Sequence, residues 1–175
     1  MMRCPMNLRF RLATELDLPK IKRIIGEAQA KLRKEHVDQW QNGYPTDDIL
    51  RKDITNENRF VMIDAEDRLL GSFTLVVGDD PNYEVIKGAW KSNNPYVVLH
   101  RLAIASSFQK LGLARKCLSF VEQKAKSYSI RSFRVDTHED NLPMRRLLKS
   151  VGFTYCGIIS VADGTPRRAY EKELG

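Results

Sequence analysis

The stretch LAIASSFQKLGLAR, at residues 102–115, marks the point where a predicted strand gives way to a predicted helix. The apolar segment ends near Ala105, and the helix begins near Gly112, which permits close approach to its backbone. The first amides of a helix lack partners within it and lie at the positive end of its dipole. We therefore predict a phosphate-binding loop here, to which Lys110 and Arg115 add positive charge. Neither a Walker loop nor the three-glycine dinucleotide fingerprint is present.

Outward from this junction, the spacing of apolar residues predicts alternating strands and helices. Strands are predicted at residues 8–12, 59–63, 69–77, 96–105, 132–137, 153–161 and 168–172. Helices are predicted after Thr14, after Thr46, and at residues 113–126 and 142–150. Segments 39–45 and 78–95 are predicted to be irregular loops. The order β-α-α-β-β-β-α-β-α-β-β favours a single α/β domain with a mixed sheet.

The composition limits the class of protein. The chain has 175 residues, of which 42% are hydrophobic and 29% charged, which suits one folded domain and argues against disorder. No apolar run approaches the length of a membrane span, and the first residues lack the apolar segment of a signal peptide. Three cysteines without paired spacing favour a reduced, cytoplasmic protein. We predict one domain at residues 7–175, preceded by a short extension at residues 1–6.

The net charge of +7 is unevenly distributed along the chain. Residues 1–35 carry a net charge of +5, residues 36–95 carry −5, and residues 96–175 carry +7. No run of Lys or Arg exceeds two residues, so neither a membrane-binding patch nor a nucleic-acid-binding tail is predicted. The basic third segment suits a polyanionic ligand and the acidic middle segment suits a cationic one, although an incidental surface asymmetry is the plainer alternative.

Residues 109–114, QKLGLA, match the Gln/Arg-x-x-Gly-x-Gly/Ala signature of the GNAT superfamily of acyl-CoA-dependent N-acyltransferases. The preceding strand, the following amphipathic helix and the downstream Asn141 and Gly152-Phe153 lie where that family has them. The sequence thus resembles GNAT proteins, small bacterial members in particular, from about Leu8 to its end. The resemblance implies a single-domain GNAT-like α/β fold, with a central mixed, mostly antiparallel twisted sheet flanked by about four helices. It also implies an N-acetyltransferase that moves an acetyl group from acetyl-CoA to a primary amine by direct transfer in a ternary complex, without a metal.

The resemblance further implies how the coenzyme is held. The backbone amides of residues 109–114 would hold the pyrophosphate of coenzyme A, and the exposed edge of residues 102–104 would pair with its pantetheine arm. Asn141 would hydrogen-bond the pantetheine region, and it is also a plausible helix cap. The predicted coenzyme-binding residues are Leu102, Ala103, Ile104, Gln109, Lys110, Leu111, Gly112, Leu113, Ala114, Arg115 and Asn141.

Acetyl transfer to an amine needs a base, because a primary amine is protonated at neutral pH. Period-two alternation places four side chains on one face of the central strand: Val98, His100, Leu102 and Ile104. His100 is therefore a candidate base near the thioester, with an ordinary structural histidine as the alternative. Asp136 and His138 form a second candidate cluster at the end of the next strand, where a carboxylate beside an imidazole could raise its basicity. The alternative for this cluster is a polar, helix-capping turn.

The departing thiolate benefits from a proton donor. Many superfamily members supply this proton from a Tyr seven residues after the Asn at the head of the helix, a position that Leu148 occupies here. The remaining candidate donors from the last strands are Tyr155 and Tyr170, with Cys156 beside them. Cys117 falls on the apolar stripe of its helix, which favours a packing role.

Large aromatic residues among acidic ones suggest where a cationic amine would bind. Trp40 and Tyr44 lie in one predicted loop, and Tyr83 and Trp90 lie in the other. A dimer contact and a folded-down lid are the alternatives, so a homodimer remains open. Two other functions also remain: an acyl-CoA sensor on the same fold that has lost turnover, and a basic nucleic-acid-binding protein, which the acidic middle segment disfavours.

Overall fold

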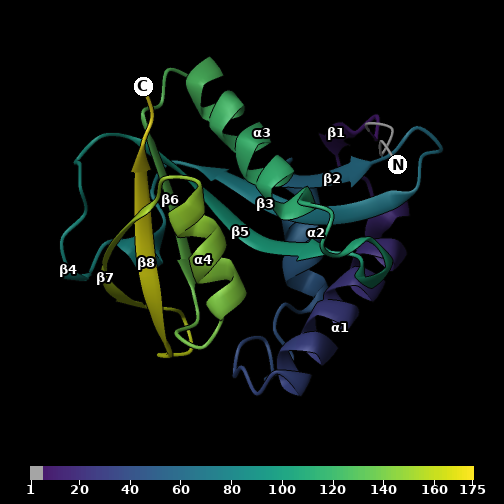
Figure 1. Ribbon diagram of the computed structural model, residues 1–175, viewed down its shortest axis with the longest axis horizontal. Helices are drawn as coiled ribbons and strands as arrows, with labels where there is room; N and C mark the ends of the chain where they lie inside the picture. Colours follow the sequence, from purple (N-terminus) through teal and green to yellow (C-terminus); the bar gives the residue numbers. More distant parts are fainter. Residues whose placement is uncertain (1–5) are drawn as a thin grey trace.

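The computed structural model describes residues 6–175, and its elements follow the predicted order (Figure 1). The helices are α1 (Leu18–Lys34), α2 (Asp47–Thr55), α3 (Leu113–Ser127) and α4 (Leu142–Ser150). The strands are β1 (Arg9–Leu12), β2 (Arg59–Ile63), β3 (Leu69–Val77), β4 (Lys87–Gly88), β5 (Tyr96–Ile104), β6 (Ser132–Thr137), β7 (Thr154–Ser160) and β8 (Pro166–Glu173). The short β4 is an addition, since it forms within a segment that was predicted to be irregular. Cys4 and most of the predicted extension at residues 1–6 lie outside the described residues.

Within residues 6–175, eight strands form one sheet in the order β1-β2-β3-β5-β6-β8-β7-β4. Strands β5 and β6 run parallel, and the other neighbouring strands pair antiparallel. The prediction of a mixed, mostly antiparallel sheet with about four helices is therefore confirmed. No helix in this part of the chain is long and apolar enough to cross a bilayer.

The two faces of the sheet are covered differently. Helices α3 and α4, which lie in front of the sheet in Figure 1, pack their apolar stripes over one face around Phe73 and Phe133. Helices α1 and α2 cover the other face over β2, β3 and the end of β5, where Ile21, Ile24 and Leu50 are buried. On that same side, a third cluster over β5, β7 and β8 is closed by the loop segment 78–95.

Strands β5 and β6 separate after their first half. They pair over three residue pairs, from Tyr96 opposite Ser132 to Val98 opposite Arg134. Beyond Val98 the two strands diverge, as Figure 1 shows, while β5 continues to pair with β3 as far as Ile104. The edge of β5 that faces β6 is therefore left open along residues 99–104.

A bulge in β5 changes the predicted alternation of side chains. Arg101 has a φ of 52°, and the register with β3 shifts between Ser72 and Thr74, so that two β5 residues oppose one β3 residue. The extra residue inverts the alternation, and Leu102 and Ile104 pack with Leu99 toward α3 and α4. The prediction that His100 shares a face with Leu102 and Ile104 is therefore wrong.

Candidate functional site

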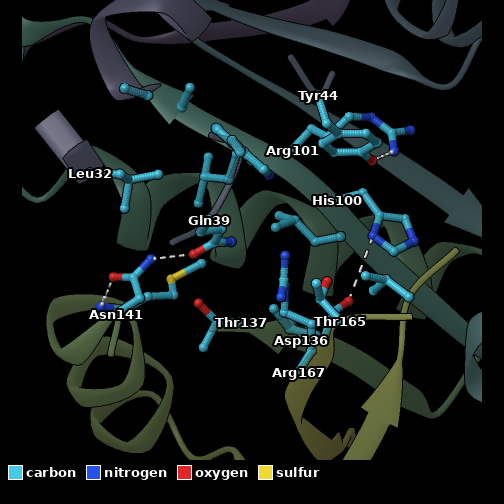
Figure 2. A pocket seen from close by; sticks show the side chains of 18 of the residues that line it. Leu32, Gln39, Tyr44, His100, Arg101, Asp136, Thr137, Asn141, Thr165 and Arg167 are labelled. Atoms are coloured by element: carbon cyan, nitrogen blue, oxygen red, sulfur yellow. Dashed lines mark hydrogen bonds and ion pairs between the residues drawn. The ribbon is translucent and has the colours of Figure 1, made fainter. Parts of the chain in front are cut away.

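A cleft of about 880 Å³ opens where β5 and β6 separate (Figure 2). Its walls are the second half of β5, the end of β6, the start of α4, the α1–α2 loop and the β7–β8 turn. Two hydrogen bonds join these walls. The Asn141 amide donates to Oε1 of Gln39 at 3.0 Å, and the Asn42 amide donates to Oδ2 of Asp163 at 2.9 Å. The α1–α2 loop is thereby held over both ends of the cleft.

The loop between β5 and α3 presents unpaired backbone amides at one end of the cleft. Gln109 Nε2 donates to the carbonyl oxygen of Ile104 at 3.0 Å, which closes the loop on the end of the strand. Lys110 and Gly112 both have positive φ, 63° and 75°, so the chain turns sharply into the helix. The first helical amide with a partner is that of Lys116, which donates to the Gly112 carbonyl at 3.3 Å. Among the described residues, the amides of 110–115 form no hydrogen bond, so they can hold a phosphate group.

The predicted coenzyme residues divide into two groups. Those that line the cleft are Leu102, Ala103, Ile104, Gln109, Ala114 and Asn141. Those that do not are Lys110, Leu111, Gly112, Leu113 and Arg115. Leu113 is buried in the core, and Arg115 donates to the hydroxyl of Ser150 at 2.9 Å. The backbone amides of this second group are free to bind phosphate, and the Lys110 side chain is exposed on the same loop.

Asn141 fills the helix-cap role that was its alternative assignment. Its Oδ1 accepts a hydrogen bond from the Met144 amide at 3.3 Å at the start of α4. Its Nδ2 is the group that reaches Gln39 across the cleft. A coenzyme contact by Asn141 stays a prediction.

His100 lies on the floor of the cleft between two carboxylates. Its Nε2 is 2.5 Å from Oδ2 of Asp80, and its Nδ1 is 3.9 Å from Oδ1 of Asp136. The hydroxyl of Tyr83 donates to that same Asp136 oxygen at 2.7 Å. Figure 2 shows His100 and Asp136 facing one another across the floor of the cleft.

The charge states of two groups beside His100 follow from their surroundings. Burial would raise the pKa of the Asp80 carboxyl, but the hydrogen bond and charge of His100, together with Asn82, hold that pKa below its usual value. Burial, followed by the charge of Asp136, raises the pKa of Tyr83 well above its usual value. Asp80 is therefore ionised and Tyr83 protonated at neutral pH. Because an ionised carboxylate only accepts hydrogen bonds, Nε2 of His100 donates to Asp80, and Nδ1 is the nitrogen that accepts a proton when the ring is neutral.

The second predicted cluster does not form. Asp136 pairs with His100 and Tyr83, whereas His138 lies beyond the end of β6, where its Nδ1 accepts the Asp140 amide at 3.1 Å. The two side chains diverge because the strand ends at Thr137. His138 does not line the cleft.

The predicted proton donors lie outside the cleft. Tyr170 is buried in the core on the side of α3 and α4, and its ring packs edge-on against that of the more exposed Tyr155. Neither tyrosine lines the cleft. Leu148 is fully buried on the inner face of α4. Burial raises the pKa of the Cys117 thiol to about 12, as expected of a packing residue. Their positions therefore do not support Tyr155 or Tyr170 as the acid.

The four aromatic residues predicted to contact substrate separate into two pairs. Trp40 and Tyr44 line the cleft from the α1–α2 loop. Tyr83 and Trp90 do not line the cleft: Tyr83 is only 2% exposed and packs against Trp90 with the ring centroids 5.2 Å apart. Trp90 donates its indole proton to the Tyr83 carbonyl. This pair lies behind His100 and lines a second, smaller cavity of about 430 Å³.

Several residues of the cleft were not predicted from the sequence. Asp80 lies in the segment 78–95 that is predicted to be an irregular loop, and the neighbouring Pro81 and Asn82 give no signal that it faces a strand twenty residues away. Arg101 donates two hydrogen bonds to Asp53, at 2.7 and 2.8 Å, and one to the Tyr44 hydroxyl at 2.6 Å. The bulge turns Arg101 toward these partners, and no periodic pattern predicts a bulge. In residues 6–175 no group of three or more His, Cys, Asp or Glu is arranged to hold a metal ion.

Known proteins share this fold and the sequence that builds it. The profile of the acetyltransferase (GNAT) family matches residues 28–153. A GNAT-family acetyltransferase from Streptococcus agalactiae is 33% identical, with a TM-score of 0.84 over 96% of each chain. One from Listeria monocytogenes is 19% identical, with a TM-score of 0.75 over 95% of each chain. The structure of the NatC complex bound to Gag peptide and CoA contains a chain that is 14% identical, with a TM-score of 0.69 over 97% of this chain and 100% of that one. No curated protein matches the sequence closely enough to count as a relative.

The match to the Streptococcus agalactiae protein first identifies a class, the acetyltransferases with this α/β fold. Within that class, the chain belongs to the acetyltransferase (GNAT) family, because the family profile covers well over half of its length. Membership supports acyl-CoA-dependent acetyl transfer as the general activity.

Proposed function

We propose that this protein transfers the acetyl group of acetyl-CoA directly to a primary amine, with both substrates bound at once in the cleft between β5 and β6. One observation carries the proposal. The unpaired edge of β5, the His100 imidazole, and Gln109 and Ala114 from the loop that carries the free amides all border the same cleft. A thioester donor and its acceptor would therefore meet at the floor of this cleft.

The coenzyme end of the cleft suits the donor. Free amides at a helix N-terminus bind phosphate, and an open strand edge can hydrogen-bond an extended amide-containing chain. The pantetheine arm of coenzyme A is such a chain, so residues 99–104 would pair with it while residues 110–115 hold the pyrophosphate. The NatC structure, which shares the fold, holds CoA.

His100 is the proposed base. Asp80 keeps the proton on Nε2, so Nδ1 can accept a proton from the amine as its nitrogen attacks the acetyl carbon. An acceptor that is cationic in solution first loses one proton to water. The C–N bond then forms, the C–S bond breaks, and the second proton, held by His100, can pass to the departing thiolate. This route needs no tyrosine at the position of Leu148.

The acceptor end carries negative charge. Asp79, Asp80, Asp136 and Asp163 all line it, and Trp40 and Tyr44 add aromatic faces. Carboxylates and aromatic faces both attract an ammonium ion, which supports an amine that is cationic in solution. Cytoplasmic location and a homodimer stay predictions.

Release of free thiol in the presence of acetyl-CoA and a panel of amines tests the proposal. We expect calorimetric binding of acetyl-CoA and thiol release with at least one amine. Absence of acetyl-CoA binding at millimolar concentration would refute the assignment of the cleft.

The second candidate function is an acyl-CoA sensor, favoured by the buried Leu148 where many relatives have a catalytic tyrosine. Binding of acetyl-CoA without acetylation of polyamines, aminoglycosides, amino acids or peptide N-termini would favour the sensor. Acetylation of any of these would favour the enzyme.

A further inference from the structure

One buried arginine in the cleft has no carboxylate partner. Arg167, near the start of β8, is 7% exposed and lines the cleft. Its one hydrogen bond to the described residues runs from Nη1 to the carbonyl oxygen of Pro166 at 3.0 Å, and it forms no ion pair with them. Figure 2 shows its side chain beside Asp136, extending into the cleft.

The other buried arginines are compensated. Arg101 forms a bidentate pair with Asp53, Arg59 lies 3.8 Å from the same carboxylate, and Arg134 lies 3.7 Å from Glu171. Burying an unpaired guanidinium is costly, because the charge loses its hydration and gains no counter-ion. Arg167 forms no ion pair with the described residues, although its charge contributes to lowering the pKa of Asp163, and it lies at a place that a ligand can reach.

The charge of Arg167 lies at the acceptor end, not at the coenzyme end. Arg167 and His100 both border the part of the cleft that the β7–β8 turn covers, and the carboxylates of Asp80 and Asp136 flank His100 there. This end therefore offers acidic groups for an ammonium ion and a guanidinium for an anion. A simple polyamine would satisfy the first and be repelled by the second.

We propose that the acceptor is an amino acid, or another amine that carries a carboxylate close to its amino group, and that Arg167 binds this carboxylate. A guanidinium and a carboxylate form two parallel hydrogen bonds, which fix the orientation of the ligand as well as its affinity. Held in this way, the amine would face Nδ1 of His100. The inference rests on the proposed function: the ammonium group first loses one proton to water, its neutral nitrogen bonds to the acetyl carbon, the C–S bond breaks, and a second amine proton passes through His100 to the thiolate.

A purely structural role for Arg167 is the alternative. Its charge would then only offset that of Asp136 and Asp163, and any amine would be accepted regardless of a carboxylate. The two roles differ in substrate selectivity. If Arg167 binds the carboxylate of the acceptor, the enzyme prefers amines that carry one; if Arg167 is purely structural, it has no such preference.

Matched acceptors test this difference. The purified full-length protein is assayed for thiol release with amino acids, their amides and the corresponding decarboxylated amines, for example phenylalanine, phenylalaninamide and phenethylamine, and lysine, lysinamide and cadaverine. The variants are Arg167→Met, which removes the charge but keeps a side chain of similar length, and Arg167→Lys, which keeps the charge but cannot donate two parallel hydrogen bonds to a carboxylate. Arg168→Met is the matched control, since Arg168 follows on the same strand, contacts Glu139 and does not line the cleft.

We expect the wild type to prefer an amino acid over its decarboxylated amine. Arg167→Met should lower kcat/KM for the amino acid by at least about 30-fold, mainly through KM, because it removes one partner of a buried charge pair. Turnover of the decarboxylated amine should change little, and Arg167→Lys should recover part of the loss. Arg168→Met, the melting temperature and the affinity for acetyl-CoA should match the wild type.

Two results would overturn the inference while leaving the proposed function intact. One is a wild type that acetylates the decarboxylated amine as well as the amino acid. The other is an Arg167→Met variant, folded and able to bind acetyl-CoA, that loses both activities equally. If no amine is acetylated at all, the proposed function fails. Calorimetry with amino acids in the presence of CoA then tests the inference. Amino-acid binding to the wild type that is lost in Arg167→Met supports it, and no amino-acid binding to the wild type refutes it.

Discussion

At the scale of single residues, the proposed base, His100, has two ring nitrogens with different surroundings. Asp80 accepts from Nε2 at 2.5 Å, while Nδ1 lies 3.9 Å from Asp136, whose Oδ1 is occupied by the Tyr83 hydroxyl. Because Tyr83 stays protonated and Asp80 stays ionised, the hydrogen-bond network determines which nitrogen can act as a base.

Replacing His100 tests its role as the base. His100→Gln should lower kcat for the acceptor found in the thiol-release assay by about 10²- to 10⁴-fold, the range typical of a lost general base, with the affinity for acetyl-CoA unchanged. His138→Gln is the matched control, since this second histidine lies outside the cleft. Equal losses in the two variants, or a His100→Gln enzyme with normal turnover, would contradict the assignment.

At the scale of elements, two irregularities in β5 shape the cleft. The separation of β5 from β6 after Val98 leaves one edge of β5 open, and the bulge at Arg101 reverses which face the later residues cover. A regular strand would have placed His100 and Leu102 on the same face. In the structure, His100 borders the acceptor end while Leu102 and Ile104 pack toward α3 and α4.

The role of the loop before α3 in acetyl-CoA binding can be tested at Gly112. Gly112 has a φ of 75°, and no heavy atom lies within 4 Å of the position that a Cβ would take, so a valine there meets open space but a strained backbone. Gly112→Val should cost about 1–2 kcal/mol of stability from its left-handed conformation and weaken acetyl-CoA binding by about tenfold or more by blocking the amides. Calorimetry and denaturant unfolding measure the two effects.

The Gly78→Val variant is the control that separates the effect of backbone strain from the effect on acetyl-CoA binding. Gly78 has a φ of 93° and the same open surroundings, and it lies at the opposite end of the β3–β5 ladder from Ile104. This control should lose similar stability and keep normal acetyl-CoA binding. Equal weakening of binding in both variants would show that strain alone accounts for the result at Gly112.

At the scale of the whole molecule, periodic sequence patterns predicted the fold and the position of the loop before α3, but not the contacts around His100 and Arg101. Apolar spacing and helix caps are local, so elements such as α3 and β6 fall close to their predicted ends. His100 and Asp80 meet across twenty residues of loop and strand, and Arg101 meets Asp53 across forty-eight. Contacts of that kind depend on a bulge and on loop paths, which leave no periodic signal.

The buried Asp53 joins α2 to the sheet beneath the acceptor end. It accepts from Arg101 and from the hydroxyl of Thr74 at 2.7 Å, and Arg59 is fully buried nearby, where burial lowers its pKa to about 9. Both arginines therefore remain charged at neutral pH and share one carboxylate. Asp53→Asn should destabilise the fold by about 3–5 kcal/mol, because two buried cations lose their counter-ion.

Denaturant unfolding at pH 7 measures this loss. Asp67→Asn is the control, since its carboxylate forms only an exposed ion pair with Arg9, and its loss should cost less than about 1 kcal/mol. A small effect of Asp53→Asn would show that the buried arginines are satisfied by Thr74, Tyr44 and Ser72 without the carboxylate.

The loss of folding stability at low pH should depend on Glu171, which lies on β8 within the sheet. Glu171 is fully buried and accepts hydrogen bonds from Ser132, Ser92 and the Lys91 amide, so β8, β6 and the segment after β4 meet at one carboxylate. Burial would raise its pKa, but these hydrogen bonds and the charge of Arg134 hold it below the usual value of 4.5.

A carboxyl group whose pKa is lower in the folded state adds stability above its unfolded-state pKa and loses that contribution as the pH falls through its folded-state pKa. The free energy of unfolding should therefore fall as the pH drops below about 4.5. Glu171→Gln should be less stable at pH 7 and show a shallower fall toward acid, whereas parallel pH profiles would place the acid-sensitive group elsewhere.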